Sequence, residues 1–373
     1  MHHNTRVDIN LRAYRHNLQT LTSFLAPGCR LCAVLKADAY GHGLKQLAPI
    51  ADASCVEAIA IVDNWEAETI RQMGIKRIII RLRPAVLDEI SEALPWGVEE
   101  IVGSIDQAEA LSTIGQKNNQ HIPVHLALDV GISRMEFSNP IQPDDLKRLA
   151  ALPGIVIKGV MAHFPCADED DISISKSQGD QFVQEYKNMA PYLPDDVSIH
   201  IANSAATMRL PESHHDLARL GIITYGLSPT NEINFDNRFK PVMTVTSRVV
   251  QVRQVPKRST IGYGMTHRVD SDAYIATLPV GYADGYRREF SNKADVLIGG
   301  ERCPVVGKVS MNMITVDVSR LKHVQAGDEA VLLGEQGTEV ITAEELAHHA
   351  NTINYEITCL LGRINRQWRC TIV

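Results

Sequence analysis

Short apolar runs alternate with helix-like stretches over roughly the first 230 residues of the chain. The runs are rich in Val, Ile and Leu, which is typical of strands covered on both faces, as in a parallel sheet. They occupy Leu31–Leu35, Ala58–Val62, Ile78–Ile80, Val124–Leu128, Ile155–Met161, Ser198–Ala202 and Gly221–Tyr225. Helical patterns between them cover Leu11–Leu25, Asn64–Met73, Ile105–Ile114, Pro143–Leu152 and Ser177–Met189. Repeated strand–helix units predict a TIM-like (β/α)8 barrel.

The pattern changes after about residue 238, where short β-like runs follow one another with glycine-containing turns between them. These runs are Val242–Val255, Tyr274–Val280, Ala294–Ile298, Cys303–Val318 and Glu329–Leu333, and one helical pattern, Thr342–Ala350, interrupts them. We therefore predict an α/β protein in which a barrel at residues 1–237 is followed by a smaller, mainly β C-terminal domain at residues 238–373.

Composition narrows the classes of function. The net charge of −7 and the lack of a concentrated basic stretch argue against nucleic-acid binding. No secretory signal or membrane-spanning segment is found, so we expect no membrane partner and a cytoplasmic location. Seven dispersed cysteines are consistent with reduced thiols, and the C-x-x-C of Cys29 and Cys32 lacks a second ligand pair, so we expect no metal site.

Chemically active residues follow several of the apolar runs. In a barrel, the loops after the carboxyl ends of the strands build the active site. The residues at these positions are Lys36 with Tyr40, Arg134, His163, Asn203 with Ser204, and Arg219. Each alone is explained by an ordinary structural role, but together they meet at one end of the barrel. A desolvated lysine there is an amine nucleophile, hydroxyls and glycine amides bind phosphate, and an arginine binds a carboxylate.

The segment Ala33–Gly43 (AVLKADAYGHG) resembles the signature around the cofactor lysine of alanine racemases. Similar blocks follow in the family's order along essentially the whole chain, which argues strongly against a chance match. They are Asp129–Met135, Met161–Glu169, Asn203–Ala206, Arg219–Gly226, Gly262–Gly264, Pro279–Tyr286, Gly307–Met313 and Asn354–Glu356. The resemblance implies a fold-type III enzyme with pyridoxal 5′-phosphate, a homodimer with shared active sites, and racemisation of a small amino acid, alanine first.

The resemblance also implies roles for individual residues. Lys36 carries the cofactor and is one acid/base, and Tyr263 from the partner subunit is the other. The residues expected around the cofactor are Tyr40, Ser204, Tyr355, Gly221 and Ile222 at its phosphate, Arg219 at the pyridine nitrogen, His163 nearby, and Asn203. Arg134 and the Met311 backbone are expected to steady the substrate carboxylate and the ring oxygen, and Tyr282 is assigned to the substrate site.

These roles fit the chemistry of racemisation, which removes a proton on one face of a carbanion and delivers one on the other. Tyrosine is a poor base at neutral pH, so we expect Arg219, acting through His163, to ease proton loss from Tyr263. Arginine keeps its own proton, so the ring nitrogen opposite Arg219 stays unprotonated, which shortens the life of the carbanion and limits transamination.

Two positions depart from the family pattern. Many members carry a carbamylated lysine where this chain has Ala127, and an aspartate where it has Asn312. The carbamate normally orients the arginine that matches Arg134, which here requires another partner, such as a bound halide or a solvent network. Both departures remove negative charge near that arginine. Either the two changes compensate each other, or they indicate a changed substrate preference.

Four alternatives stay open. The first is a racemase of serine or of broader specificity, against which Tyr355 would keep the pocket small. A fold-type III decarboxylase would pair the ring nitrogen with an acidic residue and use a cysteine of the second domain. A non-catalytic carrier of pyridoxal phosphate would lack the β domain, and a metal-dependent barrel hydrolase would show His-x-His after the first strand. A biosynthetic and a catabolic role remain equally open.

Overall fold

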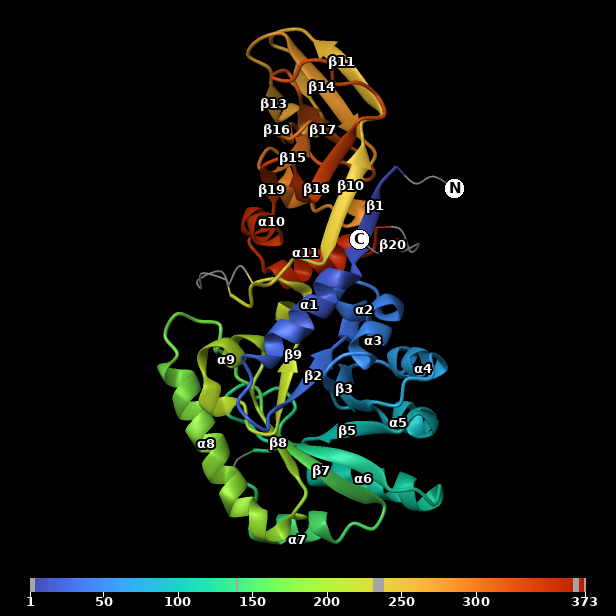
Figure 1. Cartoon of the computed structure of the whole chain (residues 1–373), viewed down its shortest axis with the longest axis vertical. Helices are drawn as coiled ribbons and strands as arrows, with labels where there is room; N and C mark the ends of the chain where they lie inside the picture. The colour runs from blue at the N-terminus through green and yellow to red at the C-terminus, as the bar shows by residue number, and fades with distance from the viewer. Residues whose placement is uncertain (1–3, 139, 231–237, 365–368, 372–373) are drawn as a thin grey trace.

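The computed structural model describes residues 4–138, 140–230, 238–364 and 369–371. Two regions lie one above the other along the long axis of the molecule (Figure 1). A parallel barrel with helices on its outside forms one end, and mainly antiparallel sheets form the other. Within the described residues, no helix is both long enough and apolar enough to cross a membrane.

The barrel consists of eight parallel strands in the order β8-β7-β6-β5-β4-β3-β2-β9. They are β2 (Arg30–Val34), β3 (Val56–Ile61), β4 (Ile78–Arg81), β5 (Val98–Val102), β6 (Ile122–Ala127), β7 (Ile155–Met161), β8 (Ser198–His200) and β9 (Leu217–Leu220). The end strands β8 and β9 also contact each other, so the barrel is nearly closed. Most residues of these strands are buried, because helices cover the outer face and side chains fill the interior. The predicted TIM-like fold is confirmed.

Helices surround the barrel (Figure 1). They are α1 (Leu11–Thr22), α3 (Leu44–Asp52), α4 (Asn64–Gln72), α5 (Leu87–Ala93), α6 (Ile105–Lys117), α7 (Pro143–Ala150), α8 (Ser173–Met189) and α9 (Ser204–Arg209), with 3-10 turns η1 (Leu94–Trp96), η2 (Ala190–Tyr192) and η3 (Pro211–Ser213). Side-chain caps fix several starts: the Ser104 hydroxyl accepts a hydrogen bond from the amide of Gln107 at the start of α6. The five predicted helices all occur within a few residues of their expected ends.

Two strand predictions need correction. The run Gly221–Tyr225 is not a strand: Ile222–Tyr225 forms the 3-10 turn η4, and the strand β9 ends just before it at Leu220. A short buried apolar run has the same pattern in either structure, so periodicity did not separate them. Strand β5 was missed because its sequence, VEEIV, carries two glutamates. One of them, Glu100, is buried because it forms an ion pair of 2.8 Å with Arg81.

The second region is mainly β, as predicted. Its largest sheet has the order β16-β15-β18-β10-β1-β20, with β19 beside β18, and a smaller sheet has the order β11-β14-β17. The strands are β10 (Met243–Arg248), β11 (Gln251–Val255), β12 (Thr260–Ile261), β13 (His267–Arg268), β14 (Ala273–Leu278), β15 (Asp295–Ile298), β16 (Glu301–Pro304), β17 (Ile314–Asp317), β18 (Glu329–Gln336), β19 (Glu339–Ile341) and β20 (Arg369–Thr371). Its helical segments are η5 (Tyr263–Met265), η6 (Tyr282–Asp284), η7 (Arg288–Phe290), α10 (Ala343–Ala350) and α11 (Asn354–Leu361).

The first strand of the chain lies in the sheet of the second region. β1 (Arg6–Asn10) pairs antiparallel with β10 and parallel with β20, so residues from both ends of the sequence meet there. Nothing in the hydrophobic pattern indicates this long-range pairing. The domain boundary expected between residues 237 and 238 adjoins 231–237, which are outside the described residues, and it stays a prediction.

Candidate active site

A cavity of about 600 Å³ opens at the carboxyl ends of the barrel strands. Ten of the residues predicted for the site line it: Lys36, Tyr40, Arg134, His163, Asn203, Ser204, Arg219, Gly221, Ile222 and Tyr355. Helix α11 of the second region packs against the turn after β2 and brings Tyr355, Glu356 and Cys359 to the same cavity. Among the described residues, no group of three His, Cys, Asp or Glu side chains is placed to hold a metal ion.

Lys36 begins an unusual backbone turn, α2 (Lys36–Tyr40), directly after β2. The four residues from Ala37 to Tyr40 have φ angles between 53° and 55°, a left-handed conformation that costs about 1–2 kcal/mol for each residue with a side chain. Hydrogen bonds hold the turn: the amide of Leu44 donates to the Asp38 carboxylate at 2.7 Å, and the amide of Asp38 donates to buried Glu66 at 3.3 Å. The strain is thus maintained by surrounding structure at the point where Lys36 enters the cavity.

The Lys36 side chain is partly buried and lies in a cationic environment. Burial lowers the pKa of Lys36 below its usual value, and the nearby guanidinium groups of Arg134 and Arg219 lower it further. A lower pKa leaves more of the amine unprotonated near neutral pH, and only the unprotonated amine is a nucleophile or a base. Lys36 therefore has the chemistry to form a covalent bond to a carbonyl group and to accept a proton.

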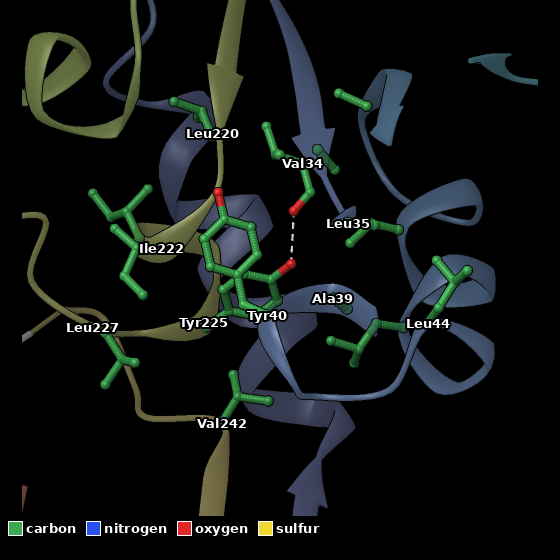
Figure 2. Packing of buried hydrophobic residues seen from close by; sticks show 14 of the residues in the cluster. Val34, Leu35, Ala39, Tyr40, Leu44, Leu220, Ile222, Tyr225, Leu227 and Val242 are labelled. Carbon is green, nitrogen blue, oxygen red and sulfur yellow. Dashed lines mark hydrogen bonds between the residues drawn. The ribbon is translucent and has the colours of Figure 1, made fainter. Parts of the chain in front are cut away.

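Tyr40, Ser204 and Gly221 form one corner of the cavity. The amide of Gly221 donates a hydrogen bond to the Ser204 hydroxyl at 3.1 Å, and a Cβ at Gly221 would lie only 2.5 Å from the Tyr40 hydroxyl. The Tyr40 ring packs against Tyr225, 5.1 Å between centroids, while the Tyr225 hydroxyl donates to the carbonyl of Val34 (Figure 2). Only glycine fits position 221, so its backbone lies directly beside two hydroxyl groups. Hydroxyls and close backbone amides are suitable partners for a phosphate.

Arg219 lies within β9, fully enclosed at the floor of the cavity. Its Nη2 donates to Nδ1 of His163 at 3.3 Å and to the carbonyl of Ala162 at 2.8 Å. Burial lowers the pKa of Arg219 to about 10, so the group stays cationic at neutral pH. Burial, with the nearby charges of Arg219, Arg134 and Lys36, lowers the pKa of His163 to about 3, so His163 is neutral.

Arg134 has a carboxylate close by that the sequence analysis did not identify. Oε2 of Glu136 accepts hydrogen bonds from the amides of Arg134 and Met135, and its Oε1 lies 3.9 Å from Nη2 of Arg134. The Glu136 side chain is fully buried, whereas the Arg134 side chain is half exposed toward the cavity. Ala127 is buried in an apolar cluster with Ile101 and Met161. A charged residue two positions from Arg134 was the available signal in the sequence.

Asn203 has a structural role that its predicted place at the cavity did not reveal. Its side-chain oxygen caps α9 by accepting a hydrogen bond from the amide of Ala206 at 2.9 Å. The cap fixes the first turn of the helix and with it Ser204. Cavity-lining Cys359 was also missed, because a half-buried cysteine on a helix has no distinguishing sequence pattern.

Three predicted residues do not line the cavity. Tyr263, Met311 and Tyr282 belong to the second region, and their exposed fractions are 69%, 56% and 44%. Two of them, Tyr282 and Met311, are linked by backbone contacts around η6, where the amide of Ala283 donates to the Met311 carbonyl at 2.9 Å. Large apolar side chains are rarely exposed in such a cluster without a partner surface. Their expected roles, for Tyr263 from a second subunit, stay predictions.

Comparison with known proteins gives a consistent result. Residues 9–229 match the family model described as alanine racemase, N-terminal domain, and residues 242–368 match that of the C-terminal domain. The chain is 41% identical to an alanine racemase of Syntrophobacter fumaroxidans over 96% of this chain and 95% of the relative. It is 40% identical to a broad specificity amino-acid racemase of Pseudomonas taetrolens over 97% of this chain and 88% of that protein.

A solved structure shares the whole architecture. The crystal structure of alanine racemase from Bartonella henselae with covalently bound pyridoxal phosphate superposes with a TM-score of 0.85 and 26% identity, and the match covers 100% of both chains.

Proposed function

The chain belongs to the alanine racemase family, and we propose that it interconverts the L and D forms of a small amino acid, with alanine as its first substrate. The family depends on pyridoxal 5′-phosphate. The observation that carries the proposal is the partly buried Lys36 amine, with a lowered pKa, facing a cavity beside two arginines. A fixed cation at Arg219, in place of a carboxylate, favours racemisation over the decarboxylase alternative.

The residues of the cavity fit this cofactor. The corner at Tyr40, Ser204 and Gly221, which a Cβ at position 221 would fill, would hold the phosphate, together with the backbone of Ile222 and the hydroxyl of Tyr355. Tyr355 supports the corner, because its ring lies 5.8 Å from that of Tyr40. The amine of Lys36 would bind the aldehyde carbon. Arg219 and neutral His163 would face the ring.

Gly221→Ala tests the phosphate corner. The added methyl would meet the Tyr40 hydroxyl at 2.5 Å, so Tyr40 must move. We expect the Kd for pyridoxal phosphate to rise about tenfold, because overpacking of this kind costs on the order of 1–3 kcal/mol. Titration of the cofactor-free protein by visible absorption measures it. Gly179→Ala in α8 is the control, since its Cβ meets only ordinary contacts at 3.7 Å; equal Kd values in both variants would contradict the assignment.

When bound, the cofactor withdraws electrons from the α-carbon of the amino acid and so makes its proton acidic. The chain supplies the two groups that move that proton. Nζ of Lys36 would accept or return it on one face, and the hydroxyl of Tyr263 of the partner subunit would do so on the other. Within one chain Tyr263 is exposed and outside the cavity, so we propose a homodimer in which each subunit completes the site of the other. Met311 and Tyr282, which are exposed as well, would reach the substrate in the same way.

Arg134 would bind the substrate carboxylate, and we propose that Glu136 holds it. A buried carboxylate is costly unless it is paired. Oε1 of Glu136 has no hydrogen-bond partner among the described residues, and it lies 3.9 Å from Nη2 of Arg134, with which it forms an ion pair. Glu136 thus places a negative charge beside the Arg134 guanidinium, which the uncharged Ala127 cannot do. This carboxylate takes the place of the halide or solvent network expected from the sequence.

Glu136→Gln tests this role. The amide oxygen of glutamine can still accept the bonds from the amides of Arg134 and Met135, but the charge is lost. We expect the KM for alanine to rise about three- to tenfold with a smaller change in kcat, because a half-exposed ion pair is partly screened. Steady-state kinetics measure both constants. Glu109→Gln, which breaks only a surface ion pair with Arg148, is the control; an unchanged KM in Glu136→Gln would show that Arg134 is held otherwise.

A substrate panel tests the function itself. The purified holoenzyme is incubated with L- and D-alanine, serine, lysine and arginine, and products are separated on a chiral column. We expect each enantiomer of alanine to yield the other, with serine slower. Amine and carbon dioxide from lysine without a D-product would indicate a decarboxylase, and no exchange of the alanine α-proton in deuterated water would indicate a carrier.

A racemase of broader specificity is the second candidate. The broad specificity relative from Pseudomonas taetrolens is nearly as similar as the alanine racemase relative. The space beside small Ala127 is also apolar, since Leu82, Met135 and Met161 line the cavity there. Comparable turnover of lysine and alanine in the panel would favour it. The expected cytoplasmic location stays a prediction.

A further inference from the structure

A continuous chain of hydrogen bonds runs through the interior of the barrel to Arg219. Oε2 of Glu99, near the amino end of β5, lies 2.7 Å from Nε2 of His125 in β6. Nδ1 of His125 lies 2.9 Å from Nε2 of His200, and Nδ1 of His200 lies 2.7 Å from Nη1 of Arg219. Four side chains from four strands thus connect the end of the barrel opposite the cavity with the cavity floor.

The two ends of this chain fix the direction of every hydrogen bond in it. A guanidinium only donates, so Nδ1 of His200 accepts and its proton sits on Nε2. That proton is donated to Nδ1 of His125, whose own proton is therefore on Nε2 and is donated to Glu99. The ionised carboxylate of Glu99 only accepts, so both ends demand the same direction. Burial lowers the pKa of His200 well below its usual value, in agreement with a neutral ring.

The interior of the barrel has room for the two histidines of this hydrogen-bond chain. TIM-barrel interiors are usually filled with layers of branched apolar side chains, but His125 and His200 are buried there. Gly159 in β7 makes room for them, because a Cβ at this position would lie only 2.0 Å from Nδ1 of His125. Any larger residue would displace the ring atom that joins the two histidines.

Among the described residues, the hydrogen bonds of the Arg219 guanidinium all go to neutral acceptors, so its position depends on these groups. They are Nδ1 and the carbonyl oxygen of His200, the carbonyl oxygens of Ala162 and Ile201, and Nδ1 of His163. A buried cation without a carboxylate partner is held by its hydrogen bonds alone. Its imidazole partners must therefore accept these bonds through a nitrogen that carries no proton. Glu99 and His125 ensure this for His200, since they accept the proton that would otherwise face Arg219.

We propose that Glu99, His125 and His200 are positioning residues for the racemisation reaction, which hold Arg219 in place by fixing the neutral Nε2–H forms of both histidines. The proposal rests on the proposed function only in that Arg219 faces the cofactor ring. Arg219 stays outside contact with the amino acid in this account, so a loosened guanidinium lowers kcat more than it raises KM.

Nuclear magnetic resonance of the holoenzyme labelled with ¹⁵N-histidine tests the hydrogen-bond chain directly. In the wild type, two histidines, identified by their loss in His125→Asn and His200→Asn, are expected to be neutral Nε2–H forms whose protons exchange slowly with water. Gly159→Ala displaces His125 and is expected to make the His200 proton exchange fast. Glu99→Ala frees the far end and is expected to do the same, whereas Glu99→Gln keeps an acceptor oxygen and is expected to retain slow exchange.

Kinetics on the same proteins supply the second measurement. We expect kcat for alanine to fall about tenfold in Gly159→Ala and Glu99→Ala, because each substitution removes a buried hydrogen bond. KM is expected to stay within about twofold of wild type. The visible absorption of the bound cofactor is expected to shift in both variants. Glu99→Gln is expected to restore kcat to within about twofold of wild type, and Gly179→Ala is the matched control.

The outcomes separate this proposal from the function. An Nδ1–H form of either histidine, or unchanged kcat and cofactor absorption in both Gly159→Ala and Glu99→Ala, would overturn the positioning role even in an active racemase. Should Gly159→Ala fail to fold, the Glu99 pair decides alone, because Glu99 is partly exposed at the far end of the barrel. A wild type with the expected histidine forms but no racemase activity would contradict the proposed function and leave the hydrogen-bond chain intact.

Discussion

Replacing Lys36 with alanine is expected to abolish racemisation, with kcat lowered by about 10⁴-fold or more, the scale of losing both a covalent anchor and an acid/base. The loss follows from the position of the amine as well as from its chemistry, since it is partly buried in the cavity near the charges of Arg134 and Arg219. Formation of D-alanine from L-alanine, followed by chiral separation, measures the effect. The cavity itself is expected to persist, because the turn after β2 is held by Asp38 and Glu66.

Lys45→Ala provides the matched control, because Lys45 is exposed on α3 only nine positions along the chain. It is expected to keep full activity and normal cofactor content. Borohydride treatment followed by mass spectrometry should place the reduced cofactor on residue 36 in both the wild type and this control. Retained activity in Lys36→Ala, or cofactor attached to another lysine, would remove the basis of the account.

Tyr263→Phe removes a single hydroxyl and is expected to lower racemisation in both directions by about 10²–10⁴-fold, the range of one acid/base catalyst. Lys36 remains, so the enantiomer whose α-proton faces Lys36 should still exchange that proton with deuterated water. The other enantiomer should not exchange, and little inversion should follow. Proton NMR of each enantiomer of alanine in deuterated water distinguishes these outcomes.

Tyr274→Phe is the control for this variant, because Tyr274 is another exposed tyrosine of the second region, in β14. It is expected to leave turnover unchanged. If Tyr263→Phe exchanged the α-protons of both enantiomers at the wild-type rate, a different group would have to act on the second face.

The sequence allowed the barrel and most of the cavity to be predicted, since strand ends of a parallel barrel meet by topology. Lys36 and Ser204 follow directly from that rule, whereas the role of Gly221 came only from the family resemblance. The rule failed locally at Gly221–Tyr225, where a buried 3-10 turn has the apolar pattern of a strand.

Features that depend on distant pairing were not predictable. The pairing of β1 with β10 joins segments more than 230 residues apart, and the contact of Glu136 with Arg134 depends on burial that the sequence does not reveal. The chain from Glu99 to Arg219 is of the same kind: its members lie on four strands, and only the closed barrel brings them together.

The most direct test of a site shared between subunits uses a hybrid dimer. Lys36→Ala and Tyr263→Phe chains with different affinity tags are co-expressed, and dimers carrying both tags are purified. One site of each hybrid then combines an intact Lys36 with an intact Tyr263, so we predict about half of the wild-type turnover per dimer, although each variant alone is expected to lose about 10²-fold or more. A hybrid no more active than the two parent variants would contradict the shared site.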